Sequence, residues 1–260
     1  MSRQGRVSVH QTKDGSHSLY SETFSQFYHN PNGAVEESLH VFFEKTGLIK
    51  CLESGKNVSV LEIGFGTGLN LILLADLAQK LGSSSEIRFE SIEGWPISPA
   101  DARKLNYGEF IKTPALMDSL FSIFDKIEDG QTAAQKVGPV DAVVHHTLFD
   151  DFVPVKEYPA YNFIFHDPFS PEVNSELWQP NVFSKIKAWS SKNAVLGTYC
   201  AATSARAAMA VAGWKPYRER GALGKREMTI ATAGTDFGEN AKPLNAARLV
   251  ERWENGEFAG

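Results

Sequence analysis

Cysteine is scarce in this sequence, and its scarcity narrows the kinds of protein that the sequence can encode. Among 260 residues there are two cysteines, Cys51 and Cys200. Two cysteines so far apart support neither a disulfide framework nor a zinc site with short ligand spacing. We therefore expect no metal centre. A chain of this length can bury a sufficient hydrophobic core without such cross-links.

Long apolar runs and excess positive charge are also missing. No run approaches the roughly 18–20 apolar residues needed to span a bilayer, and the N-terminal residues Met1–Arg6 lead into no signal-peptide pattern. We therefore expect a reduced, cytoplasmic protein without a membrane partner. The net charge of −5 excludes a globally basic nucleic-acid binder but leaves room for a local basic patch.

After Asn57, short apolar runs alternate with amphipathic stretches. The strand candidates are Val58–Ile63, Ile87–Glu93, Val140–Val144, Tyr161–His166, Ala194–Cys200 and Glu227–Thr232. The helix candidates are Leu69–Leu81, Ser98–Leu105, Glu176–Ser190 and Thr203–Ala212. Near-continuous apolar strands separated by helices predict a doubly wound α/β fold, with a mainly parallel sheet covered on both faces.

The two ends of the chain differ from this core. Residues 1–55 form an N-terminal extension with a helix expected over Ala34–Lys45, since apolar residues recur there at helical spacing. Residues 56–233 form the core. Residues 234–260 form a polar tail that we expect to be loosely packed except over Leu244–Trp253.

The richest motif follows the first core strand and reads Glu62-Ile-Gly-Phe-Gly-Thr-Gly-Leu-Asn70. Its glycines Gly64, Gly66 and Gly68 are spaced two apart, whereas a dinucleotide fingerprint places its third glycine three residues after the second. This spacing disfavours a nicotinamide oxidoreductase. The motif resembles motif I of class I methyltransferases, whose ligand carries an amino-acid tail. A carboxylate at Glu62 suits the ammonium group of that tail.

Two acidic residues at later strand ends complete the predicted crevice. Glu93 ends the next strand, where a carboxylate can bind ribose hydroxyls; Glu90 is its competitor but faces the opposite side of the strand. Asp167 begins a stiff Asp-Pro-Phe-Ser-Pro171 turn that resembles the [D/N]-P-P-[Y/F] turn of amino-group methyltransferases. We assign Asp167 first to orienting an amine and second to accepting its proton. The alternative for Asp167 is a turn-capping role.

Four blocks of the sequence together indicate a narrower family. The chain resembles the methyltransferase half of the tRNA 5-methylaminomethyl-2-thiouridine biosynthesis bifunctional protein family and its stand-alone relatives. The likeness runs from Ser18 to Ala231. Gly64–Asn70 matches the family's G-F-G-T-G-L-N loop throughout, and Gly224–Met228 echoes its K-R-E-M block. The other two blocks are residues 28–42 and residues 167–183.

The resemblance implies a Rossmann-like class I fold with a mainly parallel, seven-stranded sheet. It also implies S-adenosylmethionine as cofactor and methyl transfer to the aminomethyl nitrogen of a modified wobble uridine in tRNA, with Asp167 facing the amine. The expected cofactor-binding residues are Glu62, Gly64, Phe65, Gly66, Thr67, Gly68, Asn70, Glu93, Trp95, His146 and Glu36. The expected substrate-binding residues are Tyr28, Asn32, Phe169, Lys225 and Arg226.

Two departures from the family pattern leave alternatives open. Where the family has an aspartate after the third strand, this chain has His145-His146-Thr147, with Asp150 and Asp151 further along. Either His146 replaces that aspartate or the two histidines are solvated. The turn that begins at Asp167 reads Asp-Pro-Phe where the family has Asp-Gly-Phe. We expect this difference to alter the pocket for the methyl acceptor. The flavin-dependent oxidase half is also absent, so we expect another route to supply the free amine.

Three functions therefore remain to be compared. The first is methylation of a tRNA amine, supported by aromatic residues for stacking and by the basic cluster around Lys225 and Arg226. The second is methylation of a small-molecule amine, which suits the acidic net charge. The third is a cofactor-binding or RNA-binding module without catalysis.

Overall fold

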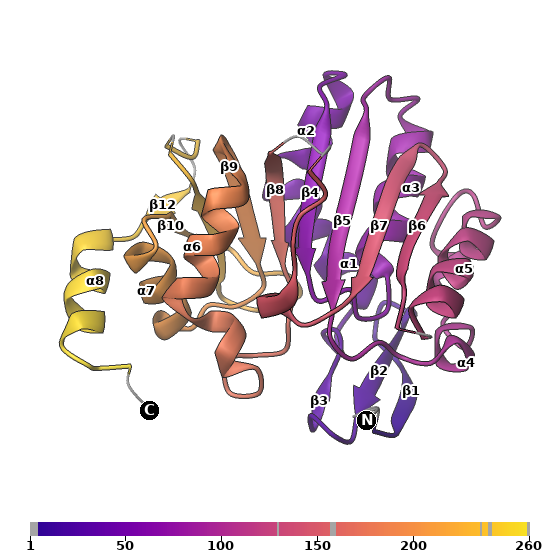
Figure 1. The fold of residues 1–260 in the computed structure, drawn as a ribbon, viewed down its shortest axis with the longest axis horizontal. Helices are drawn as coiled ribbons and strands as arrows, with labels where there is room; N and C mark the ends of the chain where they lie inside the picture. The colour runs from indigo at the N-terminus through magenta and orange to yellow at the C-terminus, as the bar shows by residue number, and fades with distance from the viewer. Residues whose placement is uncertain (1–4, 129, 157–159, 235, 239–240, 259–260) are drawn as a thin grey trace.

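The computed structural model describes residues 5–128, 130–156, 160–234, 236–238 and 241–258. These residues form one central sheet of nine strands (Figure 1). The five parallel strands at its centre are, in spatial order, β9 (Ser190–Thr198), β8 (Tyr161–His166), β4 (Val58–Ile63), β5 (Ile87–Glu93) and β7 (Val140–His146). Antiparallel strands extend both edges: β6 (Thr132–Val137) beside β7, and β11 (Met228–Thr232), β10 (Lys215–Glu219) and β12 (Lys242–Pro243) beyond β9.

The order of the strands places a ligand crevice at β4. The chain leaves β4 for β5 on one side and later returns to β8 on the other, which makes β4 the topological switch point. The register keeps the strand ends level, because Ile63 pairs with both Ile92 and His166. The segments that follow β4, β5 and β8 therefore meet at one edge of the sheet.

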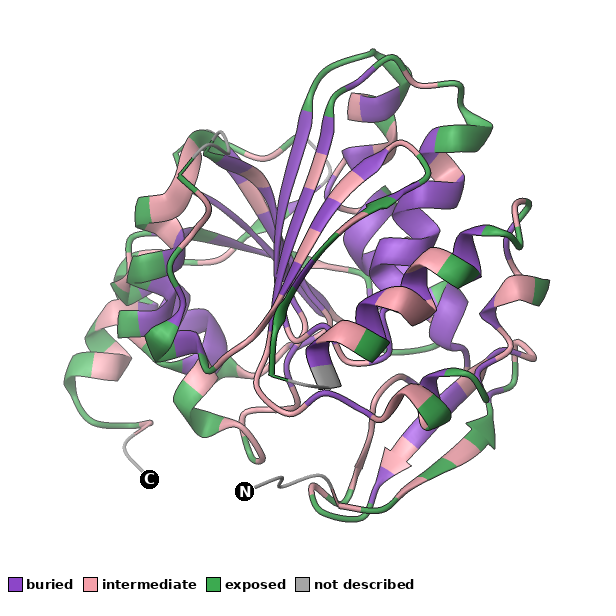
Figure 2. Cartoon of the chain, turned by 45° about the vertical axis from the view of Figure 1, so that its right-hand side comes forward, coloured by how far each residue is buried: buried purple, intermediate pink, exposed green. Residues whose placement is uncertain are grey.

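Helices cover both faces of the sheet, as expected. Alternate residues of β4 point to opposite faces, so Val60 joins one hydrophobic cluster and Leu61 the other. The first cluster includes residues of α3 (Leu69–Lys80) and α5 (Leu116–Glu128). The second includes residues of α6 (Pro180–Trp189) and α7 (Thr203–Val211). Figure 2 shows the central strands buried between these two layers.

The N-terminal region adds a small antiparallel sheet and a helical segment. Its strands are β1 (Val7–Gln11), β2 (His17–Ser21) and β3 (Gln26–Phe27). The helix expected over Ala34–Lys45 is present as α1 (Ala34–Ser38) followed by a π-helical turn, η1 (Leu39–Glu44), and then α2 (Leu48–Glu53). Buried residues of η1 and α2 belong to the same cluster as α3 and α5. Figure 1 shows the small sheet beneath the end of the central sheet.

Short elements connect the rest of the chain. They are α4 (Pro99–Ala102), η2 (Tyr107–Glu109), η3 (Phe149–Asp151) and η4 (Ser175–Trp178). In the tail, α8 (Ala246–Glu254) covers most of the stretch Leu244–Trp253 that was expected to be packed and ends one residue beyond it, and its Leu249 packs against Ala207 and Ala210 of α7. The division of the chain at residues 55 and 233 remains a prediction.

The prediction of seven strands was wrong, because the described residues place nine in the central sheet. The strands absent from the prediction are β6, β10 and β12, which lie at or near the sheet edges. Exposed and buried residues mix along β6, and β10 reads Lys-Pro-Tyr-Arg-Glu. Such strands lack the continuous apolar run of a strand buried on both faces. Helix α5 was also missed.

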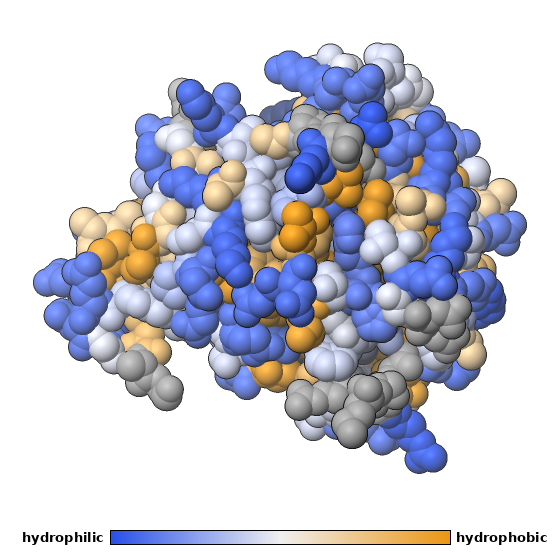
Figure 3. Space-filling model, in the orientation of Figure 1, coloured by the Kyte–Doolittle hydropathy of each residue, from blue (hydrophilic) through white to orange (hydrophobic). Residues whose placement is uncertain are grey.

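No helix in the described part of the chain combines the length and apolar character that crossing a membrane requires. Hydrophilic residues dominate the face shown in Figure 3, with apolar residues between them in separate patches.

Candidate active site

The glycine loop, residues 64–68, connects β4 to α3 and depends on the absence of side chains. Gly64 and Gly66 have φ values of 91° and 54°, in the left-handed region. A Cβ on Gly64 would lie 2.9 Å from the carbonyl oxygen of Asp167, and a Cβ on Gly66 would lie 3.3 Å from Cδ1 of Tyr28. The glycines therefore let the ends of β4 and β8 approach each other and let the Tyr28 ring of the N-terminal region pack close to the loop.

Glu93, at the end of β5, is tied to the glycine loop. One carboxylate oxygen accepts a hydrogen bond of 2.8 Å from the Gly66 backbone N–H, and the other accepts one of 2.8 Å from the Trp95 backbone N–H. Burial raises the pKa of the Glu93 carboxyl. Each oxygen retains a second lone pair for a further donor.

Asn70, in the first turn of α3, joins two buried carboxyl groups. Its amide nitrogen donates to Glu62 Oε1 at 2.9 Å and to Asp167 Oδ2 at 3.1 Å. The other oxygen of Glu62 accepts from the Ser91 hydroxyl at 2.6 Å. Asn70 Oδ1 is buried and has no hydrogen-bond partner among the described residues. Because buried amide oxygens are normally satisfied, this atom indicates a donor supplied by a ligand.

The two carboxyl groups joined by Asn70 both have raised pKa values. Burial raises the pKa of Glu62 to about 8, although its hydrogen bonds from Ser91 and Asn70 act in the opposite direction. Burial also raises the pKa of Asp167 well above its ordinary range, and the charges of Glu62 and Glu37 add to this effect. A carboxyl group so perturbed beside a cleft is typical of a functional site.

A cavity of about 880 Å³ opens beside these groups. One side, which we call the glycine-loop wall, is lined by Gly64, Phe65, Gly66, Thr67, Asn70, Glu93 and Trp95. Another part of the lining, which we call the aromatic wall, comprises Phe24, Tyr28, Glu37, Phe169, Tyr199 and Lys225. Asp167 lines the same cavity.

Three rings of the aromatic wall pack on one another. The Phe169 ring centroid lies 4.7 Å from that of Phe24 and 5.0 Å from that of Tyr28. Phe24 and Tyr28 flank β3, whereas Phe169 belongs to the turn after β8. The rings are half-buried, which leaves aromatic surface for a ligand.

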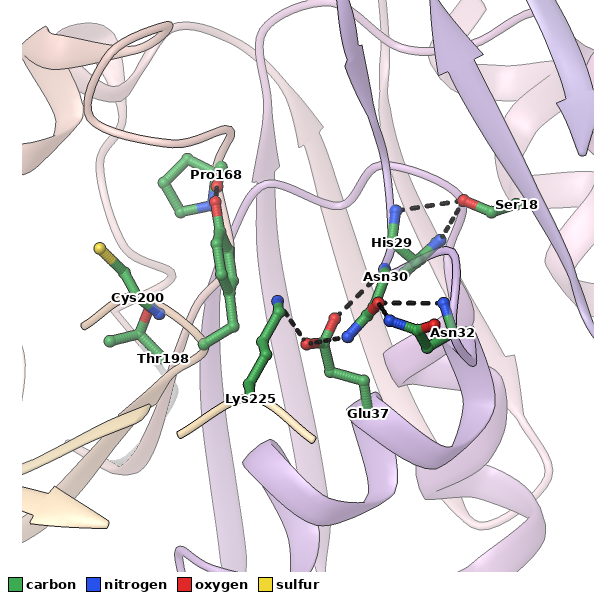
Figure 4. Close-up of polar contacts among 10 residues, drawn as sticks. Ser18, His29, Asn30, Asn32, Glu37, Pro168, Thr198, Cys200 and Lys225 are labelled. Carbon is green, nitrogen blue, oxygen red and sulfur yellow. Dashed lines mark hydrogen bonds and ion pairs between the residues drawn. The ribbon is translucent and has the colours of Figure 1, made fainter. Parts of the chain in front are cut away.

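An ion pair between Lys225 and Glu37 also belongs to the aromatic wall. Lys225 Nζ lies 2.7 Å from Glu37 Oε1, and Glu37 also accepts hydrogen bonds of 3.2 Å from the backbone and side-chain nitrogens of Asn30 (Figure 4). The same ammonium lies 5.2 Å from the centroid of the Tyr199 ring. Glu37 comes from α1 and Lys225 from the loop between β10 and β11, so this contact joins segments 188 residues apart.

Several predicted site residues do not reach the cavity. Glu36 is exposed on α1, because the buried face of that helix carries Glu37. His146 lies outside the lining, and its Nδ1–H donates a hydrogen bond of 2.7 Å to the Ile127 carbonyl oxygen. Glu62 is 1% exposed and meets the site only through Asn70. Arg226 is exposed and outside the lining.

Two further predicted residues support the site from outside the lining. Gly68 is the N-cap of α3 with φ of 73°. Asn32 donates from its backbone and side-chain nitrogens to Asn30 Oδ1, at 3.0 and 3.1 Å, so it holds the residue that in turn contacts Glu37.

Sequence reasoning missed Glu37, Tyr199 and the loop after β7. Glu37 had a usable signal, because it shares a helical face with the apolar residues Ala34 and Val41. Tyr199 directly follows β9, and no motif surrounds it. After β7 the cavity is lined by Thr147, Leu148, Phe149 and Asp150, where His146 was expected.

The comparisons with known proteins agree with this geometry. A family model described as S-adenosyl-L-methionine-dependent methyltransferase matches residues 128–234. The tRNA 5-methylaminomethyl-2-thiouridine biosynthesis bifunctional protein MnmC of Leptospira interrogans is 27% identical over 226 residues, covering 85% of this chain and 34% of its own length. The chain is an S-adenosyl-L-methionine-dependent methyltransferase. S-adenosylmethionine is its cofactor.

Other relatives of this methyltransferase give the same result. MnmC of Ralstonia nicotianae is 27% identical over 252 residues, covering 90% of this chain and 36% of the relative. The chain thus spans about a third of the length of the curated relatives it matches. The crystal structure of MNMC2 from Aquifex aeolicus shares the fold, with a TM-score of 0.72 at 21% identity over 96% of this chain and 76% of that one.

Proposed function

We propose that this methyltransferase acts on tRNA and transfers a methyl group to the aminomethyl nitrogen of a modified wobble uridine. The observation that carries the proposal is the position of Asp167, which lines the same cavity as the glycine loop and contacts Asn70 of that wall. The names of the MnmC relatives support the choice of a tRNA acceptor.

The glycine-loop wall fits the cofactor. Gly64 and Gly66 line the cavity without side chains of their own, and Asn70 Oδ1 is an acceptor suited to an α-ammonium group. Glu93 retains acceptor capacity for ribose hydroxyls at the end of β5. When bound, S-adenosylmethionine supplies a methyl group on an electrophilic sulfonium. The protein's task is then to hold a nitrogen lone pair in line with that methyl group, since positioning alone contributes roughly 7–11 kcal/mol.

Asp167 suits both the orientation of the amine and the removal of its proton. An alkylamine with a pKa near ~10.4 is protonated at neutral pH, and freeing its lone pair costs about 4–5 kcal/mol. The raised pKa of Asp167 makes its carboxylate a stronger base than an ordinary aspartate. The nitrogen gains a methyl group and loses a proton, which Asp167 accepts and passes to solvent.

The aromatic wall suits a nucleotide base that is flipped out of the RNA stack. Half-buried rings at Phe24, Tyr28 and Phe169 offer faces for stacking, which contributes about 1–3 kcal/mol per base in single-stranded recognition. In the β10–β11 loop, which also carries Lys225, Arg220 and Arg226 are exposed and form no ion pair within the described residues. They are therefore free to contact phosphates, whereas Lys215 and Arg218 pair with Asp236 and Glu227.

The test uses tRNA whose wobble uridine carries the unmethylated aminomethyl group, together with methyl-labelled cofactor. Nucleoside mass spectrometry should find the label on the wobble nucleoside. Asp167→Asn should lower the rate by about 100-fold or more, whereas Asp118→Asn on the exposed side of α5 should not. S-adenosylhomocysteine affinity should change little in either variant. If the label appears only on small-molecule amines, the acceptor is a small molecule and not tRNA. If the protein binds the cofactor but transfers no methyl group, it is a non-catalytic module.

A further inference from the structure

The Lys225 ammonium occupies a site built for a cation. It contacts the Glu37 carboxylate at 2.7 Å and lies 5.2 Å from the Tyr199 ring centroid. A carboxylate beside an aromatic face is the arrangement that recognises alkylammonium groups. Both partners are fixed in place. Asn30 donates twice to Glu37, and the Tyr199 hydroxyl donates to the Pro168 carbonyl oxygen at 2.8 Å.

This site lies beside Asp167. One cavity is lined by Glu37, Tyr199, Lys225 and Asp167. The Tyr199 hydroxyl donates a hydrogen bond to Pro168, the residue that follows Asp167. The charges also influence one another: Glu37 raises the pKa of Asp167, and Lys225 lowers it. An ammonium group bound by Glu37 is therefore within electrostatic reach of Asp167, the proposed proton acceptor.

Lys225 itself can leave this site. Its side chain is 40% exposed, whereas that of Glu37 is 11% exposed. The lysine lies in the β10–β11 loop next to Gly224, which has φ of 82° and no atom within 4 Å of its Cβ position. The carboxylate is thus the buried, fixed partner, and the lysine is the partner with access to solvent.

We propose that Glu37 and Tyr199 form the subsite that binds the protonated amine of the methyl acceptor, and that Lys225 fills this subsite until the acceptor displaces it. The proposal rests on the proposed function, since it specifies how the amine is recognised. It follows that the enzyme selects a cationic amine over a neutral or acidic group of similar size. It also follows that Lys225 competes with the acceptor and weakens its binding.

The test compares KM for the aminomethyl tRNA in three variants and two controls. Glu37→Gln removes the carboxylate charge and should raise KM about tenfold or more, because the charged pair is lost. Lys225→Met removes the competitor and should lower KM about threefold. The double variant should match Glu37→Gln, since the lysine competes only where Glu37 is charged. Glu44→Gln and Lys192→Met, at exposed positions, should match the wild type.

S-adenosylhomocysteine affinity, measured by calorimetry, should stay constant across the set and so confirm folding. A Glu37→Gln variant with the KM of Glu44→Gln would overturn the proposal. So would a higher KM in Lys225→Met, which would instead make Lys225 a phosphate contact. If the wild type transfers no methyl group to this tRNA, the proposed function fails while the subsite remains testable. Saturation-transfer NMR with n-propylammonium should then detect binding to Lys225→Met but not to the double variant, and equal signals would overturn the subsite.

Discussion

The glycine-loop wall and the aromatic wall of the cavity differ in how their polar groups are satisfied. In the glycine-loop wall, Asn70 and Glu93 form hydrogen bonds with neighbours inside the core fold, and both Asn70 and its partner Glu62 are almost fully buried. In the aromatic wall, Glu37 accepts two hydrogen bonds from Asn30 and also forms an ion pair with a half-exposed Lys225.

This difference suggests a division of labour. A wall of buried hydrogen bonds is costly to rearrange, because each broken bond leaves a desolvated group. An ion pair with one exposed partner is exchanged at little cost. We infer that the glycine-loop wall is preorganised for the cofactor and that the aromatic wall adapts to the acceptor. Substitutions in the first wall should therefore affect folding and cofactor binding, and those in the second should affect the acceptor.

The largest effect should come from Gly64→Ala. The added Cβ would lie 2.9 Å from the Asp167 carbonyl oxygen, in addition to the strain of a positive φ. Gly82→Ala is the matched control, because Gly82 has φ of 58° but no atom within 4 Å of its Cβ position. We expect a loss of about 1–2 kcal/mol in unfolding free energy for Gly82→Ala. Gly64→Ala should lose more, and its S-adenosylhomocysteine affinity should fall about tenfold or more.

Calorimetry and thermal unfolding measure both variants. If Gly64→Ala bound S-adenosylhomocysteine as tightly as Gly82→Ala, the close approach of β4 and β8 would be irrelevant to the cofactor site.

The second prediction concerns the pH dependence of stability. The pKa of Glu62 rises from 4.5 to about 8 on folding, so the folded state favours the protonated acid. Its stabilising contribution is complete below pH 4.5 and is lost as the pH rises through 8, by up to about 5 kcal/mol. Glu62→Gln mimics the protonated acid and should flatten the fall in unfolding free energy between these two pH values.

Urea unfolding at a series of pH values gives this slope. Glu86→Gln, an exposed glutamate before β5, should keep the wild-type slope. A Glu62→Gln variant that lost stability with pH as steeply as the wild type would show that the Glu62 carboxyl is already ionised in the folded state.

The two walls also differ in how far the sequence predicted them. The glycine-loop wall lies within 32 residues of sequence, from Gly64 to Trp95, and its motif directly follows a strand. Local spacing was therefore enough to select Gly64–Gly68, Asn70 and Glu93, all of which except Gly68 line the cavity. The parallel core strands were predicted for the same reason, because each is a short run that contains β-branched or aromatic residues.

The aromatic wall could not be assembled from local spacing. It brings together Phe24, Glu37, Phe169, Tyr199 and Lys225, which come from the N-terminal region, from the segments after β8 and β9, and from the β10–β11 loop. Glu36 was chosen over Glu37 because a two-residue Glu-Glu motif does not define which side of the helix is buried. The strands β6, β10 and β12, at or near the sheet edges, were missed because pairing with neighbouring strands, and not an apolar run of their own, holds them in the sheet.

A third, smaller effect is expected from Phe169→Ala in the aromatic wall. Removing this ring takes away the partner of both Phe24 and Tyr28. We expect KM for the acceptor tRNA to rise about fivefold to 20-fold, within the range of one lost stacking contact. S-adenosylhomocysteine affinity should stay within about twofold of the wild type. Phe258→Ala, at the end of the tail, is the control. A loss of cofactor affinity as large as the rise in KM would contradict the division between the walls.

The smallest effect should come from Arg226→Ala, at the outer edge of the site. Arg226 is exposed and forms no ion pair among the described residues, so its removal leaves no acidic side chain without its partner. If it contacts a phosphate, tRNA affinity should fall about twofold to threefold, and the slope of log affinity against log salt should become shallower by about 1. Arg252→Ala removes an equal charge from α8, where the arginine is paired with Glu257, and should leave the slope unchanged. Equal slopes for the two variants would place the tRNA backbone elsewhere. Because the chain carries a net charge of −5, a shallower slope for Arg226→Ala alone would show that attraction is confined to this rim of the cavity.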